Sequence, residues 1–424
     1  MNSPSPEAPR RAPTDWASPD MQAKLKARYA SERRFRVTGF VAVTISVLFL
    51  AILMVSMTAN SLGGFTRTTI KLPLDFQTMG LTIDAAQLNG PEAAQALSVS
   101  GLQEAVNIAV TQAYGPDGTT YVAESAWVDV RDALIADPGL LGGRTIFDVP
   151  ASDDLASAAR GEGSAELGAA YTKLDTSGVI SNGFDFGFLT RSDATDPGQA
   201  GIWGALKGSM LTMLVTLLLA FPIGVLSAVY LEEYAPRNRW TDLIEVSINN
   251  LAAVPSIIFG LLGLAVFLTI MGMPRSAPLV GGMTLALMTM PVIVISGRNA
   301  IKAVPPSIRD GALAIGASRV QVVFHHVIPL ALPGILTGTI IGMARALGET
   351  APLLMIGMRA FVASPPDGVT SPASVLPVQI FLWSDEVSRG FVERTSAAII
   401  VLLVFLLVMN GLAIYLRNKF EQRW

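Results

Sequence analysis

The stretch PPSIRDGALAIGASRVQVVFHHVIPLALPG, residues 305–334, is the most informative part of this sequence. Ser307, followed three residues later by Asp310, forms a capping-box pattern, which predicts a short helix that opens with Ile308. Gly316 can adopt the left-handed backbone conformation that commonly ends a helix. We therefore predict one short helix here, followed by a turn.

A second helix is predicted directly after this turn. Ser318 and Gln321 repeat the capping-box spacing, and apolar sequence follows them. Pro329 and Pro333 would bend this helix, because proline cannot donate a backbone hydrogen bond. The whole segment predicts a compact helix, turn and helix unit, which suits docking against another protein.

The composition places the chain among integral membrane proteins. Of its 424 residues, 51% are hydrophobic and 15% are charged, whereas soluble domains carry roughly a quarter charged residues. Cysteine is absent and histidine occurs twice, so a disulfide framework and a thiolate metal site are excluded. Neither a G-x-x-x-x-G-K-[ST] phosphate loop nor a G-x-G-x-x-G turn occurs in the sequence. We expect no catalytic residue, no metal site and no nucleotide hydrolysis by this chain.

The N-terminal part contains the first predicted membrane span. Residues 1–36 are rich in proline and small polar residues and then in basic residues, so we expect a disordered, basic cytoplasmic tail. Residues 37–59 carry no charge, and a helix of that length reaches roughly 34 Å, enough to cross a hydrocarbon core of about 30 Å. Its length and position differ from those of a cleaved signal peptide. We expect a retained anchor with its basic flank in the cytoplasm.

Residues 60–200 have the composition of a water-soluble domain. They contain 18 acidic and 7 basic residues, and short strand-like and helix-like pieces alternate with loops. We expect an α+β domain inserted between two membrane spans. Its acidity agrees with a periplasmic position, since the loops rich in Lys and Arg tend to stay in the cytoplasm.

Hydrophobic sequence returns after residue 200 and predicts an all-α membrane domain over residues 201–417. With the first span this makes six helices, which places both termini on one side of the membrane. Arginine and lysine in the loops and in the tail 418–424 assign that side to the cytoplasm. The five spans expected here are 205–230, 247–271, 279–297, 331–357 and 396–416.

The helix, turn and helix segment also carries a family resemblance. Its spacing is similar to the EAA…G…LP loop of ABC importer permeases, with Asp310 in place of the usual Glu and Gly311 in place of the usual Ala. In that family the loop, here residues 305–330, is a coupling helix that enters a cleft of a cytoplasmic ATPase. The resemblance implies an ATPase contact through Ser307, Asp310, Gly311, Ala312, Gly316, Ile328 and Pro329.

Three further stretches resemble the PstA-type permeases of phosphate-specific ABC importers. They are GIWGALKGSMLTMLVTLLLAFPIGVLSAVYLEEYAP at 201–236, NNLAAVPSIIFGLLGLAVF at 249–267 and ALGETAPLLMIG at 346–357. The insert after the first span resembles that of an extended form of this permease. The resemblance implies a type I ABC importer transmembrane domain in the bacterial inner membrane. It also implies a PstC-like permease, two PstB-like ATPase subunits and a PstS-like periplasmic phosphate-binding protein as partners, with ATP and magnesium on the ATPase and no cofactor on this chain.

Arg345 and Glu349 are charged residues within an apolar run. Four residues apart, they would lie on one face of a helix and touch. In a structural interpretation each charge neutralises the other, and the pair only holds the helix. In a functional interpretation the planar guanidinium binds a tetrahedral oxyanion. The resemblance to phosphate permeases favours the second and implies a substrate pathway at Arg345, Glu349 and Thr350.

Several alternatives stay open from the sequence. Arg298 and Lys302 could add positive potential at a cytoplasmic exit, or could simply be cytoplasmic anchors. Glu232 and Glu233 are expected in water or against a neighbouring subunit. For the chain as a whole, the alternatives are a permease for another oxyanion, such as sulfate or molybdate, and a membrane sensor whose domain 60–200 detects a ligand.

Overall fold

The structure is a computed structural model that describes residues 18–79, 81, 83, 85–90, 92–161, 163–358 and 361–420. Part of the predicted N-terminal tail, residues 1–17, and the end of the chain, residues 421–424, lie outside the described residues. The chain divides into two units, residues 1–59 and residues 60–424.

Helix α1, Pro19–Ser61, forms the described part of the first unit. It contains a stretch that is long and apolar enough to cross a membrane, as predicted for residues 37–59. The prediction of a disordered tail is wrong for residues 19–36, which are helical. The physical reason is local, since these residues are mostly strong helix formers and Glu32 pairs with Arg36 at 3.0 Å across one turn.

The insert is built on a three-stranded antiparallel sheet. β1 (Thr66–Asp75) lies in the centre, between β2 (Arg144–Pro150) and β3 (Ile180–Phe184). Alternate side chains of β1, from Ile70 to Leu74, are buried, because successive residues of a strand face opposite sides of the sheet.

Helices pack against this sheet and complete the apolar core of the insert. Sheet and helices together confirm the predicted α+β character. In the described part of the insert, the helices are α2 (Ala93–Val99), α3 (Leu102–Tyr114), α4 (Gly118–Tyr121), α5 (Ala126–Ala136), α6 (Asp153–Ala159), α7 (Ala165–Thr176) and α8 (Phe186–Thr190).

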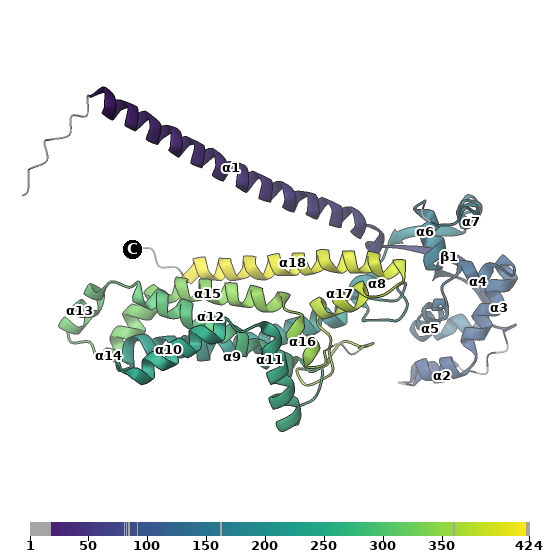
Figure 1. Cartoon of the computed structure of the whole chain (residues 1–424). Coiled ribbons are helices and arrows are strands. Elements are labelled where there is room, and N and C mark those ends of the chain that lie inside the picture. Colours follow the sequence, from purple (N-terminus) through teal and green to yellow (C-terminus); the bar gives the residue numbers. More distant parts are fainter. Residues whose placement is uncertain are drawn as a thin grey trace, which may run out of the picture. The chain divides into compact units, whose positions relative to one another are not determined.

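The membrane domain is an all-helical bundle with α12 (Pro278–Lys302) packed against α9, α10, α11 and α15 (Figure 1). Three described helices of this domain continue into π-helical turns, at Tyr230–Tyr234 after α9, at Leu264–Ile270 after α11 and at Val322–Val327 after α14. The other helices are α9 (Trp203–Val229), α10 (Arg239–Ala252), α11 (Ser256–Gly263), α13 (Pro306–Ala314), α14 (Arg319–Gln321), α15 (Ile328–Gly348), α16 (Ala351–Met355), α17 (Leu376–Ser384) and α18 (Arg389–Phe420).

Among the described residues, five helices could each cross a membrane, and a sixth span results if α10 and α11 count as one. The six-helix prediction is therefore confirmed, although two of the predicted spans, 247–271 and 331–357, are not continuous helices. The predicted span 247–271 is not a single straight helix, because α10 and α11 meet at an angle of 101°. The break lies at Pro255, which has no N–H to donate to the carbonyl of Leu251.

Buried charged groups attach the insert to the start of α18. Arg394 donates to the carboxylate of Asp185 at 2.6 Å and to the backbone carbonyls of Gly64 at 2.8 Å and Pro197 at 3.0 Å. The side chains of Arg394 and Asp185 are only 6% and 3% exposed. These acceptors come from both ends of the insert. A single guanidinium therefore binds the beginning and the end of the insert to the last membrane helix.

Helix α6 adds two contacts along the first turns of α18. Its first residue, Asp153, accepts a hydrogen bond from the hydroxyl of Ser388 at 2.5 Å. The residue that follows its last turn, Arg160, forms an ion pair of 2.5 Å with Glu393. The insert is thus a packed extension of the membrane domain, joined to it by more than its two chain connections.

Replacing Arg394 with Met is expected to destabilise the protein by about 3–5 kcal/mol, because the buried carboxylate of Asp185 loses its closer partner. The measurement is the unfolding temperature in detergent, with limited proteolysis of the insert. Adding Asp185→Asn removes the buried charge and is expected to restore part of the loss. Arg144→Gln, at an exposed arginine of the same domain, is the control. Equal stability of Arg394→Met and the wild type would contradict the attachment.

The Asp153 contact is expected to depend on pH. Burial raises the pKa of the Asp153 carboxyl, and the hydrogen bond from Ser388 only partly offsets this. The folded protein then binds this proton more readily than the unfolded chain, so the carboxyl's contribution to stability grows as pH falls through the folded-state pKa. Asp153→Asn should therefore reduce the stability gained on acidification, measured as unfolding temperature at neutral and mildly acidic pH. Asp148→Asn, at an exposed position of β2, should leave the gain unchanged.

Candidate functional site

Arg345 lies in the last turn of α15, where a membrane helix breaks. The helix ends at Gly348 and the short α16 begins at Ala351. Pro352 has no N–H to donate to the carbonyl of Gly348, so α15 cannot continue with regular hydrogen bonds. The predicted span 331–357 is therefore wrong as one continuous helix.

Glu349 belongs to this break and not to the helix. Its ψ of 121° turns the following chain out of the helix, whereas its own N–H still donates to the carbonyl of Ala346. The predicted contact between the two side chains is present, since Oε1 of Glu349 lies 3.5 Å from Nε of Arg345. Thr350 follows as the residue that precedes the first turn of α16. The three residues of the predicted substrate pathway thus lie together at one helix break.

The guanidinium of Arg345 keeps most of its hydrogen-bonding capacity. Its side chain is 47% exposed, and the contact with Glu349 uses Nε. Within the part of the chain that the structure describes, its four Nη N–H groups have no acceptor. Two such donors match two oxygens of a tetrahedral anion. The arrangement can hold an oxyanion while Glu349 orients the guanidinium.

Close packing fixes the break in place. A Cβ on Gly260 of α11 would lie 2.6 Å from Cα of Pro352, so only glycine allows α11 and α16 this close. Gly357, with φ of +90°, follows α16, and its carbonyl accepts a hydrogen bond from the hydroxyl of Ser276 at 2.5 Å. The segment after Arg345 is therefore built into the bundle and gives the side chain a defined position.

Arg298, predicted as a possible source of positive potential, has carboxylate partners. It contacts Glu245 through two nitrogens, each at 3.0 Å, and Glu232 at 3.4 Å. Lys302, in the last turn of α12, is exposed. The charge of Arg298 is thus balanced within the chain, and Lys302 is the better candidate for a role at the exit.

The predicted coupling loop forms helix α13, but it begins differently from the prediction. The helix starts at Pro306, which needs no hydrogen-bond acceptor for its nitrogen, and the residue before it makes no side-chain cap. The capping box predicted for Ser307 and Asp310 is therefore wrong. Both side chains are exposed, as is Gly311, whereas Ala312 faces the core.

The turn after α13 agrees with the prediction. Gly316 has φ of +90°, the left-handed conformation expected at this helix end. Ser318 and Gln321 form a complete capping box, with hydrogen bonds of 3.3 Å and 2.8 Å. Ile328 and Pro329 are partly buried at the start of α15 and follow a π-helical turn. The loop residues singled out from the sequence therefore span α13, the turn and the beginning of α15.

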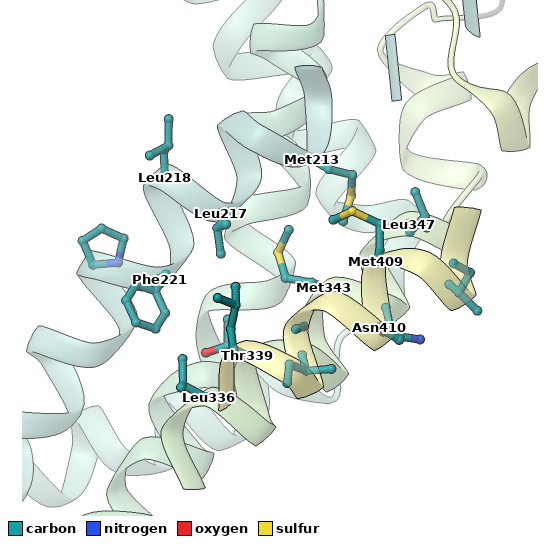
Figure 2. A pocket seen from close by; sticks show the side chains of 16 residues that line it. Met213, Leu217, Leu218, Phe221, Leu336, Thr339, Met343, Leu347, Met409 and Asn410 are labelled. Carbon is teal, nitrogen blue, oxygen red and sulfur yellow. The ribbon is translucent and has the colours of Figure 1, made fainter. Parts of the chain in front are cut away.

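A cavity of about 370 Å³ between α9, α15 and α18 is a different kind of site (Figure 2). Its walls are apolar, with side chains such as Met213, Phe221 and Met343, and Thr339 and Asn410 add the polar atoms (Figure 2). Arg345 does not line it. An apolar wall cannot replace the water that an ion loses on entering, so this cavity does not suit an oxyanion.

Sequence reasoning missed the ion pairs that join the turn after α9 to α12 and to α13. Glu233 pairs with Arg309 of α13, and Glu232 pairs with Arg298. The two adjacent glutamates at the end of α9 were the available signal. They were expected in water or against a neighbouring subunit, but both find arginines of the same chain.

Comparison with protein families defines the class. Residues 205–422 match the family of binding-protein-dependent transport system inner membrane components, and residues 22–169 match a domain of unknown function, DUF3333. Because the first match covers more than half of the chain, the protein belongs to that family. It is a multi-pass membrane permease subunit of an ABC importer.

The relatives define the type more closely, and the chain is a permease of the PstA type. It is 30% identical over 214 residues to the phosphate transport system permease protein PstA of Yersinia pestis, covering 50% of this chain and 71% of that protein. It is 32% identical over 251 residues to the probable ABC transporter permease YqgI of Bacillus subtilis, covering 55% and 84%. The match to PstA 1 of Mycobacterium tuberculosis is 34% identical but spans only half of that protein, with 37% of this chain.

Among solved structures, an inward-facing form of the MetNI methionine ABC transporter matches 52% of this chain and 95% of its own. The TM-score is 0.39 and the sequence identity is 15%.

Two glycines of the coupling loop are expected to respond oppositely to alanine. Gly316→Ala should destabilise the loop by about 1–2 kcal/mol, because a Cβ is strained at positive φ. Gly311→Ala should stabilise α13 by about 1 kcal/mol, since this glycine is helical and nothing lies within 4 Å of its Cβ position. Unfolding temperatures in detergent measure both effects. The same sign of change for both variants would show that the backbone of the turn differs from the one described.

Proposed function

We propose that this chain is the transmembrane permease subunit of an ATP-driven phosphate importer and forms half of its translocation pathway. The observation that carries the proposal is Arg345, a half-exposed guanidinium at a break in a membrane helix, whose Nη N–H groups find no acceptor among the described residues. Placing an arginine at the centre of a bilayer costs about 2.5–3.5 kcal/mol on insertion scales, so its presence favours a functional role. The phosphate transport names of several relatives support the substrate.

A second permease completes the pathway in this proposal. The exposed Arg345 is one half of an anion site, and a homologous PstC-like chain contributes the other. A PstS-like periplasmic protein delivers phosphate to the pair. Glu349 keeps the guanidinium oriented between substrates and, by competing for it, keeps anion binding weak enough for release.

Energy enters through the coupling loop. Two PstB-like ATPase subunits bind ATP and magnesium, and one of them holds α13 in a surface cleft. Apolar side chains on the outer face of α13 and its turn support this, because Leu313 is exposed and Ile315 is 82% exposed. Exposed apolar side chains of this kind commonly mark a protein-binding surface. This chain itself binds no cofactor and is not an enzyme.

The loop then fixes the orientation in the membrane. If α13 meets an ATPase, it faces the cytoplasm, and six spans place both termini on that side. The insert between the first two spans is then periplasmic, and the membrane is the inner membrane of a bacterium.

Replacing Arg345 with Ala is expected to lower phosphate uptake by about 10- to 100-fold, the effect of losing charge-assisted hydrogen bonds to the substrate. Labelled phosphate, sulfate and molybdate uptake is measured in cells that lack this chain and are complemented with each variant. Arg345→Lys should recover only part of the uptake, because a lysine ammonium does not form the two parallel bonds of a guanidinium. Arg275→Ala, at an exposed arginine between two membrane helices, is the control and should transport normally.

Normal membrane levels of each variant, checked by immunoblot, are required for this comparison. If the wild type restores sulfate or molybdate uptake in place of phosphate, the permease class holds and the substrate is wrong. If Arg345→Ala transports phosphate like the wild type, the pair with Glu349 is structural and the anion contact lies elsewhere.

A further inference from the structure

The turn after α9 is joined to α13 by an ion pair between Glu233 and Arg309, in which two guanidinium nitrogens donate to the carboxylate. Nη2 and Nε of Arg309, on α13, lie 2.6 Å and 3.1 Å from Oε1 of Glu233. Glu233 lies in the π-helical turn Tyr230–Tyr234 that continues α9. The two side chains are 22% and 12% exposed, so solvent screens this pair less than it screens a surface pair.

Arg309 also holds the end of α12. Its Nη1 donates to the carbonyl of Val304 at 2.7 Å, and its Nη2 donates to the carbonyl of Ile301 at 2.9 Å. Carbonyls at a helix C-terminus lack partners within the helix and carry partial negative charge, so a cation is favourable there. One guanidinium therefore ties α13 to the ends of two membrane helices at once.

The neighbouring Glu232 makes a parallel connection. It lies 3.4 Å from Arg298 of α12, which also binds Glu245 of α10. Beneath both pairs, an apolar cluster that includes Val229, Ile301 and Ala312 joins α9, α12 and α13. Of the two adjacent glutamates after α9, Glu232 therefore binds an arginine of the membrane bundle and Glu233 binds an arginine of α13.

We propose that Glu233 and Arg309 form the strut through which a displacement of α13 moves α9 and α12. The inference rests on the proposed function, in which α13 is held by an ATPase. A short helix such as α13 can transmit a displacement only if it is firmly attached to the helices that move, here α9 and α12. The apolar cluster resists separation, and the ion pair, which joins residues 76 positions apart in the chain, resists sliding and rotation. Both are positioning residues and touch no substrate.

The test uses the whole transporter, purified with its ATPase and reconstituted in liposomes with the phosphate-binding protein. Phosphate uptake, ATP hydrolysis and the amount of bound ATPase are measured for each variant. Glu233→Gln is expected to retain the ATPase and to hydrolyse ATP, while phosphate taken up per ATP falls about tenfold. Arg237→Gln, at an exposed arginine close behind the same turn, should match the wild type.

The absence of cysteine allows a second variant that separates transmission from folding. Glu233→Cys combined with Arg309→Cys removes the ion pair, and a short bismaleimide then joins the two positions covalently. Before crosslinking, uptake per ATP should be low; after crosslinking, it should return to at least half of the wild-type value. Bound ATPase and ATP hydrolysis, measured before and after crosslinking, separate transmission from loss of the folded loop, because a disordered loop would lose the ATPase as well.

Three results would overturn the strut. Unchanged uptake per ATP in Glu233→Gln is one, and a loss of uptake only in proportion to lost ATPase is another. Failure of the crosslink to restore uptake is the third. Failure of the proposed function is visible separately, because the wild-type complex would then bind no ATPase or take up no phosphate.

Discussion

Hydrocarbon offers no hydrogen-bond partners, and every helix of the membrane domain has to satisfy its polar groups within the protein. Several hydroxyls along the spans donate to carbonyls of their own helices. Thr216, Thr284 and Thr289 each donate to a carbonyl of the preceding turn, at 2.7–2.9 Å. Where a helix breaks, other elements pack against the break, as Gly260 of α11 does against Pro352. Breaks are possible in this bundle only where such packing exists.

The same constraint distinguishes structural arginines of the chain from the proposed substrate residue by their hydrogen bonds. Arg394 and Arg309 are surrounded by carboxylate and carbonyl acceptors at short distances, and each holds together segments that are far apart in sequence. Within the described residues, Arg345 has one contact of 3.5 Å, and its other N–H donors have no acceptor. An arginine whose donors are used up stabilises structure, whereas one with free donors can take a ligand. This difference in hydrogen bonding, more than the position in the sequence, distinguishes the proposed substrate residue from the structural ones.

The predicted coupling loop is attached to the membrane helices by apolar packing and by an ion pair. α13 and α14 lie at the end of the membrane bundle away from α17 (Figure 1). Ala312 faces the core, while Ile315 projects outward and remains available to a partner. The inner face is fixed by apolar packing and by Arg309, which in the proposed function lets a partner move the outer face without detaching the helix. The insert is joined to α18 by the same combination of apolar packing and buried ion pairs.

Local signals allowed several features to be predicted from the sequence. Hydropathy gave the number of spans, and the capping pair Ser318 and Gln321 gave the start of the second helix, because a cap depends on residues three positions apart. Gly316 gave the turn for a similar reason. The grouping of Arg345, Glu349 and Thr350 followed from their nearness in the chain.

Proline shows the limit of such signals. Pro222, Pro291 and Pro333 lie inside continuous helices, whereas Pro255 and Pro352 lie where helices break. No local pattern separates the two groups, because neighbouring elements decide whether the freed backbone groups are satisfied. The start of α13 was predicted two residues late, at Ile308 and not at Pro306, because Pro306 and Ser307 are both acceptable near a helix start.

The sequence by itself thus determined the membrane class, the six spans, the turn at Gly316 and the presence of Arg345 and Glu349 within an apolar run. Only the tertiary structure decided where the helices bend, and which carboxylate each arginine binds. The partners of Arg309 and Arg394 lie 76 and 209 residues away in the chain. Their pairing depends on how the helices pack, and that information is spread over the whole bundle.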